Sequence, residues 1–349
     1  MRVAIVYNKK NTNVINPFGM QNKEIYNPKT VKRVADALEA GGHNVEIIDG
    51  NMNVIENIRA FLPPVTEGEK FGLVFNMAYG IQGESRYTHI PAMLEMLGIP
   101  YVGSTPSGHA VALDKIITKI ILQKNDIPTP NFWFFSSADE DMSGVEYPVI
   151  VKPKMESVSF GLRVVHNEAD LKEAVAYIIS EFHQQALVEA FIRGREFAVG
   201  LIGNDPVEVF PVLEIDLEGD PDAIQTADDK KSAPRAKICP AQITPELEER
   251  MKDLSIKVFK SLGLRDFSRV DIRLDEKGDI YILEINSMAS LGSTGSYVTA
   301  ALAYGLDFNS LVNRMLDVAT IRYFASQLSD TAQSGTSKKY QRRLSFEAI

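Results

Sequence analysis

The side chains best suited to metal and phosphate chemistry lie within residues 269–286. Carboxylate and amide oxygens are ligands that Mg²⁺ prefers, and a guanidinium group can pair with phosphate. Two stretches of alternating polar and apolar residues flank a turn sequence at 275–279, which predicts a β-hairpin. Folding about residues 277 and 278 would bring together, on one face, Arg269, Asp271, Glu284 and Asn286.

The opposite face of this hairpin would be apolar and could pack on a core. Its residues are Val270, Ile272, Leu283 and Ile285. A solvated hairpin with cross-strand salt bridges is an alternative explanation of the polar face. That explanation does not account for residues 287–296, a run of mostly small residues that follows directly. Because small residues let a substrate approach the backbone closely, we interpret the hairpin as one wall of a binding site.

Four more polar residues occur where a nucleotide could bind. Lys152 ends an apolar strand and precedes 155–161, a loop whose backbone N–H groups could bind phosphate, although it lacks the Walker A spacing. Lys115 begins an amphipathic helix. Glu189 and Glu196 lie near strand ends, where their carboxylates could accept hydrogen bonds from ribose hydroxyls or an amine. Taken singly, each is explained at least as well as a surface or turn residue, and for Lys115 and the two glutamates that explanation is the better one.

The composition indicates a globular protein without broad affinity for nucleic acid or membranes. The chain has 349 residues, of which 45% are hydrophobic and 24% charged, and its net charge of −9 disfavours polyanions. The single cysteine, Cys239, excludes an internal disulfide and a cysteine-based zinc cluster. The first apolar stretch is too short for a signal peptide, and no later one would span a membrane, so we expect a cytoplasmic protein.

Strands and helices alternate over the first hundred residues, which predicts an open α/β sheet. The expected strands are 2–7, 44–49, 71–76, 100–103, 131–135, 149–153, 186–189, 196–201 and 207–213, besides the hairpin. The expected helices are 28–40, 90–97, 112–124, 170–181, 245–262 and 298–324, the last interrupted near 304–309. Residues 218–240 predict a long functional loop, and the polar composition from Ser326 predicts a disordered tail.

The order of these features resembles the ATP-grasp superfamily, and within it the D-alanine–D-alanine ligases. The likeness covers about residues 1–320 and includes 93–104 and 238–241. It implies an α/β and α+β ATP-grasp fold with three domains and a tail. These are an N-terminal α/β substrate domain (1–112), a central lobe with a phosphate-covering loop (113–188), a C-terminal lobe with the Mg²⁺ site (189–325) and the tail (326–349).

The resemblance also implies roles in binding ATP and metal. The implied nucleotide contacts are Lys115 and Lys152 with the α- and β-phosphates, the backbone of Ser159 over the phosphates, Glu189, Phe191 and Ile192 around adenine, and Glu196 with the ribose. The implied ligands of Mg²⁺, or of Mn²⁺ in its place, are Asp271, Glu284 and Asn286. Arg269 would stabilise the phosphoryl group and the tetrahedral intermediate.

The first-substrate side departs from the ligase pattern. The family's glutamate in the first strand–helix loop, which binds the substrate's ammonium group, has no counterpart at 8–13. The family's loop serine would fall at Val158, and an aromatic partner from its long loop near Lys230 or Lys231. We therefore predict that this hydrogen-bonded network is missing and that the phosphate acceptor differs. Residues that would suit an additional anionic group are Lys9, Lys10 and Lys230 or Lys231, of which the last two could instead reach the γ-phosphate.

Four further residues are candidate substrate contacts. Glu84 and His89 lie in or near the segment that replaces the family's histidine-glycine sequence, although a capping or packing role in a helix is the favoured explanation of His89. Ser296, together with Tyr297, would hold a carboxylate of the second substrate.

These features predict an ATP- and Mg²⁺-dependent carboxylate–amine ligase that forms a C–N bond. It would phosphorylate a carboxylate or a vinylogous acid and couple it to the amine of an amino acid. The product would be peptide-like or a specialised metabolite, for example of the mycosporine type. The alternatives are D-alanine–D-alanine ligation for peptidoglycan and a non-catalytic nucleotide-binding protein. The expected partners are small-molecule substrates and a second copy of the chain in a homodimer, with no nucleic acid and no membrane.

Overall fold

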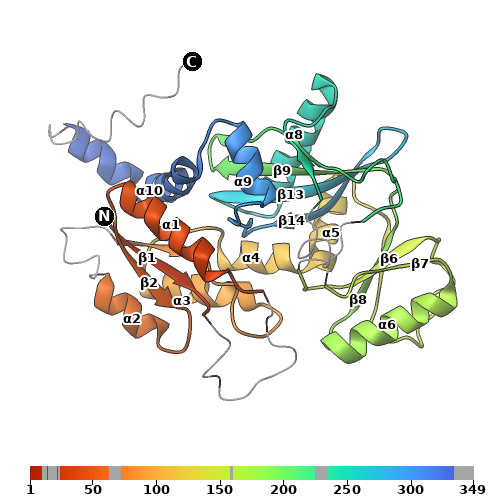
Figure 1. The fold of residues 1–349 in the computed structure, drawn as a ribbon. Helices are drawn as coiled ribbons and strands as arrows, with labels where there is room; N and C mark the ends of the chain where they lie inside the picture. Colours follow the sequence, from red (N-terminus) through yellow and green to blue (C-terminus); the bar gives the residue numbers. More distant parts are fainter. Residues whose placement is uncertain are drawn as a thin grey trace.

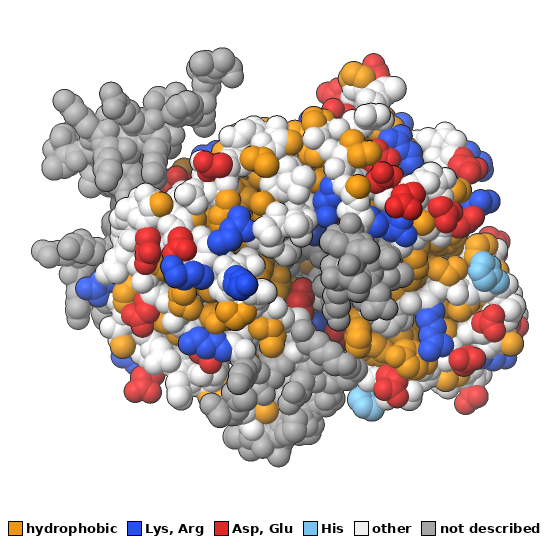
Figure 2. All heavy atoms as spheres, in the orientation of Figure 1, with side chains coloured by type: hydrophobic (Ala, Val, Ile, Leu, Met, Phe, Trp, Pro, Cys, Tyr) orange, Lys and Arg blue, Asp and Glu red, His pale blue; other side chains and the backbone are white. Residues whose placement is uncertain are grey.

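Three β-sheets organise the chain, each with its own helices (Figure 1). The computed structural model describes residues 1–9, 14, 22, 24–62, 72–157, 160–224 and 235–333. Within these residues no helix combines the length and the apolar character needed to cross a membrane. On the face seen in Figure 2, Lys and Arg side chains are interspersed with Asp and Glu.

The N-terminal sheet is parallel, with strand order β2-β1-β3-β4. Its strands are β1 (Arg2–Tyr7), β2 (Asn44–Asp49), β3 (Gly72–Asn76) and β4 (Tyr101–Val102). Its helices are α1 (Pro28–Ala40), α2 (Val54–Phe61), α3 (His89–Leu97) and the short 3-10 helix η2 (Arg86–Thr88). β1 and β3 are apolar and buried almost throughout, as expected for central strands of a sheet that is covered on both faces.

The second sheet is antiparallel, with strand order β5-β8-β6-β7. Its strands are β5 (Phe132–Phe135), β6 (Val149–Pro153), β7 (Arg163–Val165) and β8 (Ala186–Ala190). Helix α6 (Glu168–Phe182) packs its apolar side on this sheet and begins at Asn167, whose side chain accepts a hydrogen bond from the backbone N–H of Asp170.

The third sheet has strand order β12-β11-β9-β13-β14, with β10 beside β9. Its strands are β9 (Arg195–Gly203), β10 (Val207–Val209), β11 (Leu213–Ile215), β12 (Lys237–Ile238), β13 (Phe267–Leu274) and β14 (Ile280–Asn286). Helix α8 (Pro245–Ser261) covers one face of this sheet. The other face meets α9 (Ser296–Ala303), α10 (Phe308–Gln333) and, farther along, a cavity.

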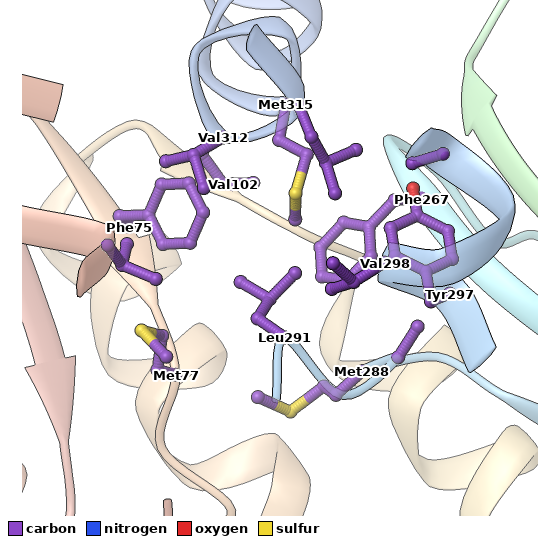
Figure 3. Close-up of a cluster of buried hydrophobic side chains, with 14 of the residues drawn as sticks. Phe75, Met77, Val102, Phe267, Met288, Leu291, Tyr297, Val298, Val312 and Met315 are labelled. Atoms are coloured by element: carbon purple, nitrogen blue, oxygen red, sulfur yellow. The ribbon is translucent and has the colours of Figure 1, made fainter. Parts of the chain in front are cut away.

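A shared apolar cluster joins the first and third sheets. Figure 3 shows Phe75 and Val102 of the N-terminal sheet on one side and Phe267 and Tyr297 of the C-terminal part on the other, with Leu291 between. Leu291 belongs to the small-residue segment after β14 and is 1% exposed. This packing fixes the segment against the N-terminal sheet.

Most predicted elements are confirmed, but one predicted helix is two. The expected helix over 112–124 is divided into α4 (Pro106–Leu113) and α5 (Lys115–Lys124). Asp114 lies between them in an extended conformation, and its side chain accepts hydrogen bonds from the backbone N–H groups of Ile116 and Ile117. A capping carboxylate therefore starts a new helix where hydrophobic periodicity alone suggests continuity. The predicted domain boundary at 112 falls inside α4, and the division into domains stays a prediction.

Other differences concern short elements and the tail. The expected strand over 207–213 is divided into β10 and β11, and α2, β7 and β12 were not predicted. The disordered tail was predicted from residue 326, but α10 continues to Gln333, because extending an established helix costs far less than starting one. Residues 334–349 lie outside the described residues.

Candidate active site

The hairpin of β13 and β14 has the predicted pairing at its functional end. Arg269 lies opposite Asn286, and Asp271 lies opposite Glu284. The register then shifts after Asp271, so that Ile272 pairs with Ile282. The extra residue, Leu283, lines the cavity rather than the apolar face, and its predicted position is wrong. A bulge adds one residue to one strand and so breaks the alternation on which that prediction rested.

A cavity of about 340 Å³ lies where the three sheets meet. Its walls include β6 and β8 of the second sheet, β9, β13 and β14 of the third, and two residues of the N-terminal part, Glu24 and Tyr79. The predicted site residues that line it are Lys115, Lys152, Glu189, Phe191, Ile192, Glu196, Arg269, Asp271, Glu284, Asn286 and Ser296. The structure thus gathers into one space residues that are spread over more than 180 positions of sequence.

The polar side chains of the hairpin contact one another. The Arg269 guanidinium donates to both carboxylate oxygens of Asp271, at 2.6 and 2.7 Å. The Asn286 amide nitrogen donates to Asp271 Oδ2 at 3.0 Å. Glu284 lies 3.9 Å from the ammonium group of Lys115. Two carboxylates, an amide and two cations therefore face the same part of the cavity.

Two of the nucleotide-binding candidates, Glu189 and Lys152, form a charge cluster with the buried Lys119. The Glu189 carboxylate pairs with Lys119 through one oxygen and with Lys152 through the other. Glu189 and Lys152 line the cavity, whereas Lys119 is 0% exposed. Burial lowers the pKa of Lys119 to about 8, and the charge of Glu189 opposes this shift. Lys119 was not predicted, although its place one helical turn after Lys115 puts both on one face of α5.

Residues 8–13 contain no acid, as the sequence shows, but an acid from later in the same connection lies at the cavity. Glu24 lines the cavity, and its Oε2 accepts hydrogen bonds from the Tyr87 hydroxyl and from Ser157 Oγ. The acid lies late in the connection between β1 and α1, outside 8–13. One signal could have found it, since Glu24 is the only acidic residue between Tyr7 and Pro28. The described partners of Glu24 are thus Ser157, of the loop after β6, and Tyr87, of η2.

The other carboxylate oxygen of Glu24, Oε1, accepts no hydrogen bond within the described part of the chain. Burial raises the pKa of Glu24 above its usual value. The hydrogen bonds from Ser157 and Tyr87 and the charges of Arg86 and Lys115 oppose that rise. A buried acid of this kind is suited to binding an ammonium group.

Of the other predicted substrate contacts, some line the cavity and some do not. Ser296 lines the cavity, but Tyr297 is 0% exposed and donates its hydroxyl to the Leu201 carbonyl oxygen at 3.0 Å, so its predicted contact with substrate is wrong. An aromatic residue beside a site serine is here a core residue. Glu84 is largely exposed, 3.8 Å from Lys154, and His89 is exposed at the start of α3; neither lines the cavity.

Several predicted residues cannot be placed. Lys10, Val158, Ser159, Lys230 and Lys231 lie outside the described residues. Lys9 is described and exposed, and its backbone N–H donates to Asp49. A lysine that was not predicted, Lys237 of β12, lines the cavity instead. Burial lowers its pKa, and the nearby charge of Arg269 adds to the shift.

Two solved structures have a similar fold. A D-alanine–D-alanine ligase from Bacillus anthracis in complex with ATP aligns with a TM-score of 0.70 at 20% identity, covering 94% of this chain and 99% of that one. The VanG D-Ala:D-Ser ligase from Enterococcus faecalis aligns with a TM-score of 0.69 at 21% identity, covering 91% and 99%. The fold is thus the predicted ATP-grasp fold.

Sequence comparison then gives the family. Residues 121–317 match the family model for the D-ala D-ala ligase C-terminus, and the chain belongs to the D-alanine–D-alanine ligase family. The D-alanine–D-alanine ligase of Carboxydothermus hydrogenoformans is 31% identical over 311 residues, which cover 85% of this chain and 95% of that protein. The uncharacterized protein y4sG of Sinorhizobium fredii is 42% identical over 332 residues, covering 93% and 99%. The protein is therefore an ATP-dependent ligase that forms C–N bonds, as predicted, rather than a non-catalytic protein.

Proposed function

We propose that this ligase joins two amino acids and that the ammonium group of the first one binds Glu24. The observation that carries this proposal is the buried Glu24 carboxylate at the cavity, one oxygen of which accepts no hydrogen bond from the described residues. The absence of such an acid was the main reason to expect a different phosphate acceptor. With Glu24 and Ser157 at the site, D-alanine is the first candidate for both substrates, as the names of the ligase relatives suggest.

The hairpin residues fit a magnesium ion. Asp271, Glu284 and Asn286 supply oxygen donors from two neighbouring strands, and hard oxygen donors are what Mg²⁺ requires. No group of three His, Cys, Asp or Glu side chains within the described ranges is placed to hold a metal, so the third protein ligand would be the amide of Asn286. Bound there, Mg²⁺ would offset the charge of the ATP phosphates.

The reaction proceeds in two steps. A carboxylate oxygen of the first amino acid attacks the γ-phosphorus of ATP, and the bond from that phosphorus to ADP breaks. The amine nitrogen of the second amino acid then attacks the acyl carbon, a C–N bond forms, phosphate leaves and the nitrogen loses a proton. Lys115 and Lys152 would bind the ATP phosphates, and Arg269 would stabilise the negative charge of the tetrahedral intermediate.

One observation favours a second candidate function. Lys237 lines the cavity near Arg269, and none of the described carboxylates pairs with it. This lysine suits an additional anionic group, as was expected of Lys230 or Lys231. One substrate would then be an acidic amino acid or the acidic precursor of a specialised metabolite, such as the vinylogous acid of the mycosporine-type reaction.

Phosphate release from ATP and Mg²⁺ would separate these functions. The assay would include D-alanine alone, then pairs of neutral and acidic D- and L-amino acids, then a vinylogous acid with an amino acid. Release with D-alanine alone supports D-alanine ligation. Release that requires an acidic partner supports the second candidate. Turnover only with an acid that carries no ammonium group would contradict the role of Glu24.

Lys237→Met is expected to lower kcat/KM about tenfold or more. A hydrogen bond to a charged group is worth about 1.5–3 kcal/mol, and about 1.4 kcal/mol corresponds to a factor of ten. A rise in KM confined to acidic substrates would indicate substrate recognition, whereas a lower kcat with every substrate would indicate contact with the transferred phosphate. Lys257→Met, on the exposed side of α8, is the control. Unchanged kinetics for Lys237→Met would rule out either role.

A further inference from the structure

Three alternate residues of β13 line the cavity, and the last of them is Arg273. The other two are Arg269 and Asp271, and side chains two residues apart share one face of a strand. Asp271 lies at the end of the cavity that also carries Lys115 and Lys152, where the phosphates of ATP would bind. Because a strand rises about 3.3 Å per residue, Arg273 lies about 7 Å beyond Asp271. That separation brings it beside the sugar of a nucleotide whose phosphates occupy the lysine end.

The cross-strand partner of Arg273 is Glu196. The two residues are paired in the ladder between β13 and β9, and Arg273 Nη2 lies 3.4 Å from Glu196 Oε2. Glu196 also lines the cavity, as do the apolar side chains of Phe191 and Ile192. A carboxylate between an apolar wall and a charged wall is suited to accept hydrogen bonds from the hydroxyl groups of a sugar.

The guanidinium group of Arg273 is fixed by backbone groups of two other segments. Its Nη1 donates to the Gly194 carbonyl oxygen at 2.8 Å, and its Nη2 donates to the Ala223 carbonyl oxygen at 2.6 Å. Gly194 has a φ of +139°, and a Cβ at this position would lie 2.0 Å from the Leu274 carbonyl oxygen, so a side chain is excluded there. The connection between β8 and β9 is thus held directly against β13, and the guanidinium group has one orientation toward Glu196.

Packing alone does not explain the charge of Arg273. The residue is 3% exposed, and burying a guanidinium group is costly because it keeps its proton. Burial lowers the pKa of Arg273, and the charges of Glu196 and Asp222 oppose this shift. An apolar side chain of similar size could pack against the ring of Phe191, whose centroid lies 5.9 Å from Arg273 Cζ, without that cost. A role toward a bound nucleotide accounts for the charge.

We propose that Arg273 is a positioning residue that orients the Glu196 carboxylate toward the ribose hydroxyls of ATP and so makes the enzyme select ribonucleotides over deoxyribonucleotides. The inference goes beyond the proposed function, because it concerns the nucleotide and does not depend on which amino acids are joined. Arg273 holds Oε2 of Glu196, and the sugar hydroxyls donate to the oriented carboxylate. A nucleotide that lacks one of these hydroxyls loses a hydrogen bond to a charged group.

The test is the equilibrium binding of nucleotides without any amino acid, measured by isothermal titration calorimetry. The ligands are ATP, 2′-deoxyATP and 3′-deoxyATP, each with Mg²⁺. We expect the unmodified enzyme to bind ATP about tenfold more tightly than at least one of the deoxynucleotides. In Arg273→Met the Kd for ATP should rise about tenfold, while the Kd for that deoxynucleotide changes much less, so that most of the discrimination is lost.

Two further variants separate positioning from a general effect on the pocket. Arg193→Met removes an exposed ion pair with Asp222, 2.7 Å long, and should leave all three Kd values unchanged. Glu196→Gln should reduce the discrimination as Arg273→Met does. The two changes combined should reduce it little further, because Arg273 acts through Glu196.

The inference is wrong if the unmodified enzyme binds all three nucleotides equally, or if Arg273→Met binds ATP normally. It is also wrong if Arg273→Met raises all three Kd values by the same factor, or if its effect on discrimination adds in full to that of Glu196→Gln. A loss of folded protein lowers the binding stoichiometry and leaves the ratio of the Kd values unchanged, so the readout does not depend on stability. If Arg273→Met does not fold, full discrimination in Glu196→Gln would still overturn the inference.

Discussion

Asp271→Asn is expected to lower kcat by about 10²–10³-fold, the usual cost of removing one group that stabilises transition-state charge. Asp271 lies on β13, an inner strand of its sheet, between Ala198 of β9 and Glu284 of β14. The substitution keeps the size of the side chain but removes the charge that pairs with Arg269 and that we assign to Mg²⁺. The backbone pairing of β13 does not depend on that charge, so the fold should be retained.

The measurement is the initial rate of phosphate release over a range of Mg²⁺ concentrations, together with urea unfolding. The control is Asp279→Asn, an exposed aspartate at the turn of the same hairpin, which should retain full activity. We expect the Asp271 variant to need much more Mg²⁺ and still to reach a lower kcat. Near-normal turnover at the usual Mg²⁺ concentration would contradict the metal assignment.

Lys119→Met is expected to lower the free energy of unfolding by about 3–5 kcal/mol, the cost of removing one partner of a buried ion pair. Lys119 is fully buried, pairs with Glu189 and donates to Thr129 Oγ1 at 2.7 Å. Its loss leaves Glu189, which is 3% exposed, with Lys152 as its one remaining cation in the described structure. Because Glu189 would then hold Lys152 more tightly, we also expect a higher KM for ATP.

Urea unfolding of a small set of variants tests this cluster. Lys124→Met, at the exposed end of the same helix, should change stability by less than about 0.5 kcal/mol. Lys119→Met combined with Glu189→Gln should be less destabilised than the sum of the two single changes, because the second removes the charge that the first left uncompensated. Additive effects of the two changes would show that Lys119 and Glu189 are not coupled.

The hairpin could be predicted from sequence because its determinants are local. Alternation, a five-residue turn and the pairing of Asp271 with Glu284 follow from neighbours along the chain. The strands of the N-terminal sheet and its helices α1 and α3 were predictable for the same reason, whereas α2 was missed. Within the hairpin the prediction failed only at Leu283, because the bulge there adds one residue and so changes which face of the hairpin the side chain occupies.

The first-substrate side could not be predicted because tertiary structure places it. Glu24 lies in an irregular connection with no periodicity, and its partners Tyr87 and Ser157 are 63 and 133 residues away in sequence. Nor does the sequence distinguish Lys119, which is buried, from Lys124, which is exposed on the same helix. Tyr297 was predicted to contact substrate because it follows a site serine, but it is buried in the core.

The residues that meet at the cavity fall into two stretches of the sequence with different proposed roles. Glu24, which would bind the first amino acid, and its partner Tyr87 precede residue 90, whereas the candidate ATP and metal residues fall between 115 and 286. The described contacts between the two stretches include Ser157 with Glu24, Arg86 with Glu156 and Glu84 with Lys154. A different recognition half could therefore be combined with the same ATP-binding half only if several contacts at this junction were matched.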